Sequence, residues 1–214
     1  MGRDETKVHH PLFARLFEKL VPVLEAKGGA EHRQELLEGL SGRVVEVGAG
    51  TGANFRHYPS TVTEVLAVEP EAYLRARAAA AARAAPVPVT VVDATAGRLP
   101  FEAGSFDGGV ASLVLCSVAD QAVALGELFR VIRPGGELRF YEHVRSERPR
   151  LARFQQAADR VWPYLAGGCH TSRETSRAIE AAGFGIERQR AFDFKPCATS
   201  ALVAPHILGA ARRP

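Results

Sequence analysis

The chain has 214 residues, 46% of them hydrophobic and 24% charged, which is the composition of an ordinary globular protein. Its length suits a single domain with a full-sized hydrophobic core. The formal net charge of +3 is too small to indicate a nucleic-acid partner, and no apolar run approaches the length of a membrane span. Three widely spaced cysteines without a CxxC pair argue against a disulfide framework or a metal site, and they favour a reducing cytoplasm.

The N-terminal region predicts one helix. The first ten residues, MGRDETKVHH, are polar and charged and do not predict a signal peptide, although Gly2 and Thr6 match the loose N-myristoylation pattern. Residues 11–29 then carry apolar side chains every three or four positions, which predicts an amphipathic helix. We expect Pro22 to kink this helix and the Gly-Gly pair at 28–29 to end it.

Short apolar strands alternate with helices over the next hundred residues. Strands are predicted at 43–48, 64–70, 87–94, 105–115 and 137–144. The intervening helices are predicted at 73–85 and 119–136. This alternation is typical of βαβ units, and it predicts a mostly parallel sheet with helices on both faces.

The pattern changes after residue 145. One helix is predicted over 151–168, and a second over 171–184 opens with a capping box formed by Thr171 and Glu174. Two last strands are predicted at 185–192 and 206–213, the final one antiparallel.

The stretch VVEVGAGTGANF, residues 44–55, joins the first strand to a turn rich in glycine. In a βαβ unit this turn faces the ligand crevice. Gly48, Gly50 and Gly52 permit positive φ angles and a close approach of the backbone to a ligand. Glu69, at the end of the second strand, can accept hydrogen bonds from both hydroxyl groups of a ribose. The combination predicts a ligand that carries a nucleoside.

Two classes of nucleoside ligand fit this turn. Residues 48–53, GAGTGA, satisfy the GxGxxA form of the dinucleotide fingerprint. Residues 46–52, EVGAGTG, satisfy the pattern of an acidic residue, a spacer and GxGxG that is typical of methyltransferases using S-adenosylmethionine. Glu46 would repel a pyrophosphate but suits the ammonium and sulfonium of S-adenosylmethionine. The second class is therefore favoured. The alternative is that Glu46 has only a structural role, as a carboxylate at the end of the strand whose hydrogen bonds are made within the protein.

Along nearly its whole length the chain resembles the class I S-adenosylmethionine-dependent methyltransferases. Five fragments narrow the resemblance to the small thiol S-methyltransferases of the methyltransferase-like group, relatives of the quinone-biosynthesis methyltransferases: GTGANFRHYP, LVLCSV, PGGELRFYEHV, GGCHTSRE and APHILGAA. Membrane-associated members of that group carry an apolar N-terminal anchor, whereas this chain has only the amphipathic helix. Contact with a membrane surface is therefore the lesser expectation for this helix, and a lid over the cofactor is the greater one.

The resemblance implies an α/β fold with a doubly wound, seven-stranded, mostly parallel sheet of the Rossmann-like methyltransferase type. The residue pattern adds an N-terminal lid helix and a helical insertion after the fifth strand. We expect one domain over residues 1–214, in which residues 1–40 form the helical lid and residues 41–145 the cofactor-binding core. Residues 146–214 are expected to supply the acceptor-side helices and the last two strands.

The resemblance also implies the cofactor, S-adenosyl-L-methionine, which leaves as S-adenosyl-L-homocysteine. The residues expected to bind it are Glu46, Gly48, Gly50, Gly52, Asn54, Glu69, Pro70, Thr95, Ala96 and Leu113. The glycines are expected to wrap the methionine and ribose, and Glu69 to bind the ribose hydroxyls.

The adenine position has two interpretations. Counting back from Asp107, the usual Asp-Ala-Glu of the family falls on residues 95–97. Either Thr95 and Ala96 hold the adenine through hydroxyl and backbone, or a two-residue insertion lets Asp93 reach the adenine amino group.

Acceptor-side residues must come from the carboxyl edge of the sheet. Topology places Cys116, His143, His170 and His206 there, together with Cys169. His143 and Cys116 are the catalytic candidates, and His170 and His206 are candidates for the acceptor pocket. The alternative for each of these residues is that it is a packed or solvated loop residue without a role in the reaction. No metal site is expected, because the spacing typical of metal ligands is missing from the sequence.

Aromatic and apolar residues are expected to complete an apolar acceptor pocket. Those on the N-terminal helix are Phe13, Phe17 and Leu20, and those beyond the fifth strand are Phe154, Trp162, Tyr164 and Phe192.

Methyl transfer from a sulfonium needs positioning more than acid–base chemistry, because the leaving group is good. A thiol, whose pKa is about 8.5, needs little help to lose its proton, whereas a hydroxyl needs a base. The favoured function is methyl transfer to a small, fairly apolar acceptor, first of all a thiol. An O- or N-methyltransferase of secondary-metabolism or quinone type, a dehydrogenase, and a non-catalytic binding module are the alternatives. The oligomeric state and the acceptor cannot be read from the sequence.

Overall fold

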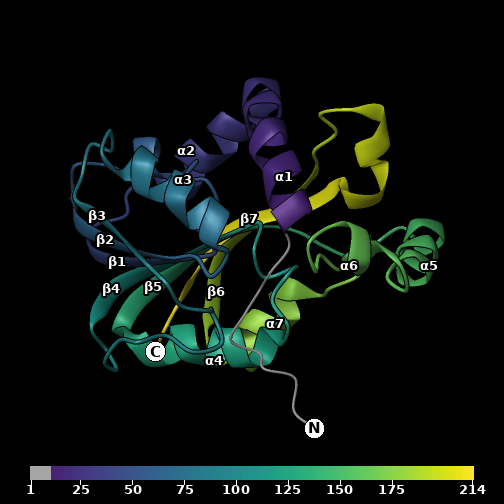
Figure 1. Cartoon of the computed structure of the whole chain (residues 1–214). Coiled ribbons are helices and arrows are strands. Elements are labelled where there is room, and N and C mark those ends of the chain that lie inside the picture. Colours follow the sequence, from purple (N-terminus) through teal and green to yellow (C-terminus); the bar gives the residue numbers. More distant parts are fainter. Residues whose placement is uncertain (1–10) are drawn as a thin grey trace, which may run out of the picture.

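The computed structural model describes residues 11–214, so the pattern at Gly2 and Thr6 lies outside the described residues. A single seven-stranded sheet forms the centre of this part of the chain (Figure 1). Its strands are β1 (Gly42–Val47), β2 (Val62–Val68), β3 (Val89–Val92), β4 (Phe106–Ser112), β5 (Ile132–His143), β6 (Gly185–Asp193) and β7 (Pro205–Arg212).

The strand order is β3-β2-β1-β4-β5-β7-β6. Strands β1 to β5 pair in parallel. Strand β7 runs antiparallel between β5 and β6. The order reverses at β1 and β4, so the carboxyl ends of these two strands open a crevice between them. The predicted seven-stranded, mostly parallel sheet with an antiparallel last strand is confirmed.

Helices cover both faces of the sheet (Figure 1). They are α1 (Pro11–Leu24), α2 (Ala30–Leu37), α3 (Ala72–Ala82), α4 (Gln121–Val131), α5 (Pro149–Ala158), α6 (Trp162–Leu165) and α7 (Thr175–Ala181). Shorter helical turns span Glu25–Gly29, Phe55–His57 and Ala198–Val203. None of the helices within residues 11–214 combines the length and hydropathy that a bilayer crossing requires.

The core has two halves because successive side chains of a strand point to opposite faces. On one face Val44 of β1 packs with Leu36 and Leu37 of α2. On the other face its neighbour Val45 packs with α4 and α7, including Leu125. Strands buried on both faces must be apolar almost throughout, which is why the sequence shows short apolar runs rather than alternation.

The N-terminal helix differs from expectation in two ways. The backbone leaves helical values at Lys27 and Gly28, where φ reaches +112°, rather than at Pro22. An unpredicted helix, α2, follows at once. Leu16 and Leu20, two apolar residues of the predicted amphipathic pattern, are 65% and 42% exposed. Only part of the apolar surface of α1 is therefore covered within the described residues.

The C-terminal region also corrects two predictions. The expected helix over 151–168 is divided into α5 and α6. The capping box does not form, because the N-terminal cap of α7 is Glu174 and its side chain makes no capping hydrogen bond. Thr171 instead donates its hydroxyl to Asp159 and to the carbonyl of Gln155. This contact ties the segment before α7 to the end of α5.

Candidate functional site

The turn after β1 depends on glycine at three positions, all with φ between +59° and +80°. A Cβ on Gly48 would lie 2.1 Å from Val114 Cγ2, and one on Gly52 would lie 2.7 Å from the Phe55 ring. These two glycines are therefore required by packing against the protein itself. A Cβ on Gly50 would lie 3.3 Å from Phe17 and would otherwise enter the cavity described next.

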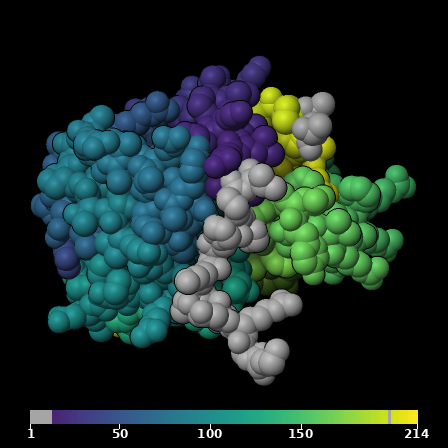
Figure 2. Space-filling model, viewed as in Figure 1, coloured from purple at the N-terminus to yellow at the C-terminus, as the bar shows by residue number. Residues whose placement is uncertain are grey.

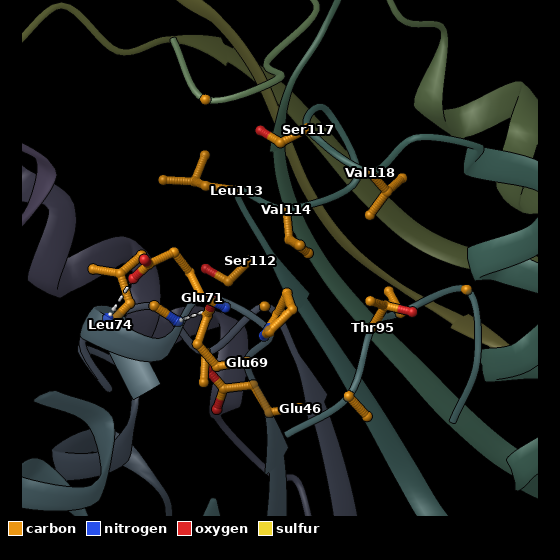
Figure 3. A pocket seen from close by; sticks show the side chains of 18 of the residues that line it. Glu46, Glu69, Glu71, Leu74, Thr95, Ser112, Leu113, Val114, Ser117 and Val118 are labelled. Atoms are coloured by element: carbon orange, nitrogen blue, oxygen red, sulfur yellow. Dashed lines mark hydrogen bonds between the residues drawn. The ribbon is translucent and has the colours of Figure 1, made fainter. Parts of the chain in front are cut away.

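A cavity of about 1200 Å³ opens over the carboxyl ends of β1, β2 and β4. Its wall is built from the turn at 48–54, the end of β2 at 69–71, the loop at 93–102 and the loop at 112–120. Figure 3 shows Glu46, Glu69 and Glu71 on one side of it and the 112–118 loop on another. Pockets for a single small ligand are usually about 300–1,000 Å³, so this cavity has room for a cofactor and an acceptor together.

Two carboxylates form an acidic wall of this cavity. Glu46 is 2% exposed and accepts hydrogen bonds from Tyr58 (2.7 Å) and Asn54 (2.9 Å). Burial raises the pKa of Glu46 to about 7, although both hydrogen bonds oppose the shift. Glu69 accepts from the backbone N–H groups of Gly50 (2.8 Å) and Glu71 (2.9 Å), and burial raises its pKa as well. Both carboxylates are held in fixed positions and would be stabilised by a bound cation or hydroxyl donor.

A buried arginine also reaches this cavity. Arg33 of α2 is 8% exposed and donates to Glu25 (2.8 Å), Asn54 (2.8 Å) and Ser112 (2.9 Å). It thereby links the N-terminal region to the turn after β1 and to the end of β4. Sequence reasoning missed Arg33, because nothing in the local pattern of α2 distinguishes it from a surface arginine. An arginine and two carboxylates in the lining of one cavity suit a ligand that carries both a carboxylate and an ammonium.

The loop after β4 is held by Glu142, which is fully buried at the end of β5. Its carboxylate accepts from the backbone N–H groups of Val114 (3.0 Å), Leu115 (2.9 Å) and Cys116 (3.3 Å). Leu113 takes a φ of +56°, which is uncommon outside glycine, and donates its N–H to Tyr141 O at 2.7 Å. The backbone of this wall is thus fixed by its own hydrogen bonds.

The comparisons with known proteins agree with this geometry. A family model described as a methyltransferase domain matches residues 45–140. Human thiol S-methyltransferase TMT1A is 38% identical over 178 residues, which cover 80% of this chain and 71% of that protein. Human thiol S-methyltransferase TMT1B is 34% identical over 219 residues, covering 94% of this chain and 87% of that protein.

The chain is a class I S-adenosylmethionine-dependent methyltransferase.

A solved structure shares the fold of this methyltransferase. The S-adenosylmethionine-dependent methyltransferase from Thermotoga maritima superposes with a TM-score of 0.69 at 22% identity, covering 94% of this chain and 95% of that one. The predicted cofactor, S-adenosylmethionine, and the predicted enzyme class are confirmed by the family assignment. The residues around the cavity fit this cofactor, since Arg33, Glu46 and Glu69 line one cavity and offer partners for a carboxylate, an ammonium and a ribose.

The structure brings together nine of the ten residues predicted to bind the cofactor of this methyltransferase. They line the cavity: Glu46, Gly48, Gly50, Asn54, Glu69, Pro70, Thr95, Ala96 and Leu113. Gly52 does not line it, because its position is taken up by packing against Phe55 and Ala81.

Both interpretations of the adenine position remain geometrically open, since Asp93, Thr95 and Ala96 all line the cavity. The Asp93 side chain is 68% exposed and pairs with Arg75 at 2.9 Å. A carboxylate already paired with a cation at the surface is less suited to an adenine amino group. We therefore infer that Thr95 and Ala96 supply the adenine contacts.

Of the four candidates for the acceptor pocket, two line the cavity. Phe13 and Phe17 of α1 line it, and Figure 2 shows the purple N-terminal part of the surface between the blue part and the yellow C-terminal part. His170 does not line it, because its backbone N–H bonds to Cys116 O and its ring lies 3.8 Å from Asp159. His206 does not line it either. Its ring stacks among aromatic residues that include Phe192, and burial lowers its pKa to about 4.

The other aromatic residues expected in the acceptor pocket lie elsewhere. Phe154 and Tyr164 are 64% and 85% exposed. Phe192 stacks on His32 with ring centroids 4.5 Å apart. The apolar part of the cavity wall includes instead Val114 and Val118 of the loop after β4.

The two catalytic candidates, Cys116 and His143, are buried next to this wall rather than in it. His143 Nε2 lies 3.0 Å from Cys169 Sγ. The neighbouring Cys116 sulfur and burial hold the pKa of the Cys169 thiol above its usual value. Neither Cys116 nor His143 is among the residues that line the cavity.

Proposed function

We propose that this enzyme transfers the methyl group of S-adenosylmethionine to the sulfur of a small, fairly apolar thiol. The observation that carries the proposal is the similarity to the two human thiol S-methyltransferases, which spans 71% and 87% of their lengths at 38% and 34% identity. Similarity of this extent includes the acceptor side of the site as well as the cofactor turn.

The chemistry of the cavity wall supports a thiol over a hydroxyl. Among the described residues that line the cavity there is no histidine, lysine, cysteine or tyrosine. Carboxylates do line it, but those of Glu46, Glu69, Glu71 and Asp120 already accept hydrogen bonds from other groups of the protein. The acceptor side is formed by Phe13, Phe17, Val114 and Val118, with the hydroxyl of Ser117 as a polar group. A hydroxyl acceptor would require a base at this wall, whereas a thiol with a pKa of about 8.5 ionises readily near neutral pH.

The residues act mainly by position. The cofactor supplies an electrophilic methyl group on a sulfonium. Glu46 and Arg33 would hold its ammonium and carboxylate, and Glu69 would hold its ribose, which fixes the direction in which the methyl group points. The Glu142-bound loop and the α1 phenylalanines would confine the acceptor sulfur in line with that methyl group and exclude water. Alignment of two reactants in this way accounts for most of the rate in such displacements.

The test compares matched acceptors that differ only in the reacting atom. Benzyl mercaptan, benzyl alcohol and benzylamine would each be incubated with the full chain and S-adenosylmethionine, and methylated products measured by mass spectrometry. We expect the methyl thioether alone, with a rate that rises with pH as the thiol ionises. Methylation of the alcohol or the amine in preference to the thiol would refute the proposal. S-adenosylhomocysteine binding without any methylated product would indicate a binding module.

A further inference from the structure

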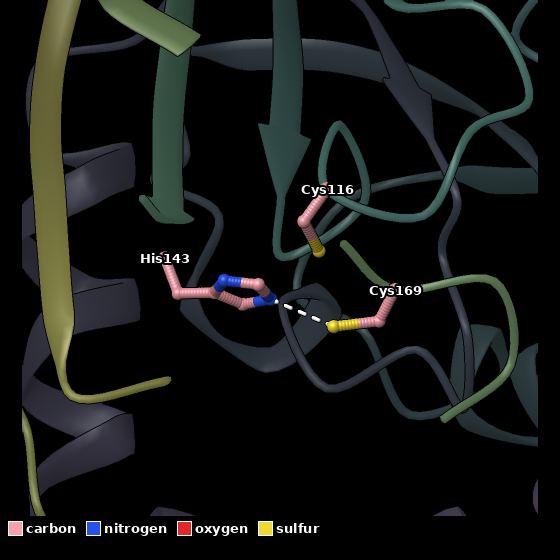
Figure 4. A group of neighbouring side chains, drawn as sticks. All are labelled: Cys116, His143 and Cys169. Atoms are coloured by element: carbon pink, nitrogen blue, oxygen red, sulfur yellow. Dashed lines mark hydrogen bonds between the residues drawn. The ribbon is translucent and has the colours of Figure 1, made fainter. Parts of the chain in front are cut away.

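Three side chains able to bind soft metal ions converge beside the acceptor wall. Cys116 follows β4, His143 is the last residue of β5, and Cys169 precedes α7. One ligand atom from each, a sulfur or a ring nitrogen, lies within 4.8 Å of the other two. Figure 4 shows the three side chains pointing toward one another. This Cys116–His143–Cys169 cluster is the only such group found in residues 11–214.

We propose that the Cys116–His143–Cys169 cluster is a binding site for Zn²⁺. Two cysteines and one histidine are a donor set used by zinc sites that keep a fourth position open. Bonds of about 2.3 Å to sulfur and about 2.0 Å to nitrogen place tetrahedral ligand atoms roughly 3.5–3.8 Å apart. The separations in the cluster start at 3.0 Å and stay within 4.8 Å, so small side-chain rotations would accommodate the ion. Two thiolates would also balance its charge in a buried place.

The surroundings of the cluster hold the ligands in place. The His170 N–H donates to Cys116 O at 2.8 Å, which ties the Cys169 segment to the loop after β4. The Trp162 Nε1–H donates to Cys169 Sγ at 3.4 Å, as expected of a hydrogen bond that supports a thiolate. All three ligand groups are buried, so an ion bound there would be largely shielded from solvent. Glu142 is not a competing ligand, because three backbone amides occupy its carboxylate.

If the proposed function holds, the acceptor thiol would bind at the open fourth coordination position of the zinc ion. Ser117, which follows Cys116, and Gly167, two residues before Cys169, both line the cavity, and Cys116 Sγ is 3.4 Å from Ser117 Oγ. A metal–sulfur bond would form as the S–H proton passes to solvent. The new carbon–sulfur bond would then form as the sulfonium bond breaks, whose electron pair stays with S-adenosylhomocysteine. The neutral thioether is a weak ligand and would dissociate.

Cobalt titration of the full chain tests the site. The protein would be stripped with a chelator, kept reduced with a phosphine and titrated with Co²⁺, which replaces zinc and reports thiolate ligands by charge-transfer absorption. We expect one equivalent to bind with that absorption and Zn²⁺ to displace it. Loss of one ligand should cost more than the 10–100-fold typical of supporting residues. Cys116→Ser and Cys169→Ser should therefore weaken binding by at least about 100-fold, whereas Cys197→Ser, at an exposed cysteine, should not.

Controls separate misfolding, failure of the metal site and failure of the proposed function. Calorimetric binding of S-adenosylhomocysteine would show that each variant is folded, and the wild-type spectrum needs no variant at all. No thiolate charge-transfer absorption in the wild type, or equal loss in Cys197→Ser, would overturn the zinc site. The cobalt titration and the calorimetry use no acceptor, so they test the zinc site whether or not the enzyme methylates thiols. Adding 2-mercaptoethanol to the cobalt form should change the spectrum; an unchanged spectrum would overturn the role of the fourth position.

Discussion

Replacement of Glu46 by glutamine tests how the site recognises the cationic end of its cofactor. Burial holds the pKa of Glu46 at about 7 in the free protein. With that pKa the carboxylate is ionised in roughly one molecule in ten at pH 6 and in roughly nine in ten at pH 8. If the ionised form binds the ammonium of S-adenosylhomocysteine, wild-type affinity should fall about tenfold between pH 8 and pH 6, or about 1.4 kcal/mol.

Isothermal titration calorimetry measures both the affinity and the proton balance of this step. In buffers of different ionisation enthalpy, binding to the wild type at about pH 6 should release close to one proton from Glu46. Glu46→Gln should bind more weakly at pH 8 and release no such proton. The ammonium of the ligand titrates equally with both proteins, so the ratio of their affinities isolates Glu46. A wild-type affinity that does not change with pH, with no proton released, would refute the reasoning.

Four further outcomes are expected. Because the folded-state pKa of Glu46 lies above the ordinary value of 4.5, the folded protein binds more protons between pH 4.5 and about 7. Its free energy of unfolding should therefore fall by up to roughly 3 kcal/mol as pH rises through that window, and chemical denaturation should show no such loss in Glu46→Gln. Gly50→Val places a Cβ 3.3 Å from Phe17 at a φ of +59°; it should abolish S-adenosylhomocysteine binding while circular dichroism stays native, and wild-type affinity would disprove the site. Glu69→Ala should weaken that binding at least tenfold, since hydrogen bonds to a charged group contribute about 1.5–3 kcal/mol each; an unchanged dissociation constant would move the ribose partner elsewhere. Asp93→Ala should leave the dissociation constant within about threefold, and a larger loss would assign the adenine contact to Asp93.

The sequence by itself determined the fold and the cofactor. The apolar strands had to be buried on both faces, so their alternation with helices was enough to predict a mostly parallel sheet. The resemblance to the class I methyltransferases then predicted its seven strands and doubly wound order. The cofactor turn was equally local, because Glu46, Gly48 and Gly50 are close neighbours in the chain and Glu69 follows at the next strand end. Residues held near one another by a single βαβ unit can be recognised without knowing the rest of the structure.

Only the tertiary structure decided how the segments beyond that unit meet. Arg33 lines the cavity from a helix that the sequence did not predict, whereas His170 and His206 do not line it. The predicted capping box does not form, because the Thr171 hydroxyl donates instead to Asp159 on a different segment. Contacts of this kind depend on how loops and helices pack, and no spacing in the chain encodes them.

The Cys116–His143–Cys169 cluster shows the same limit most clearly. Its members come from the ends of two strands and from the segment before α7, so they have no ligand spacing in sequence. The sequence therefore predicted the absence of a metal site. Parallel strands β4 and β5 end at one edge of the sheet, and the His170–Cys116 backbone hydrogen bond brings the third residue to them. The register of the sheet and one loop contact thus decide what the cluster can bind.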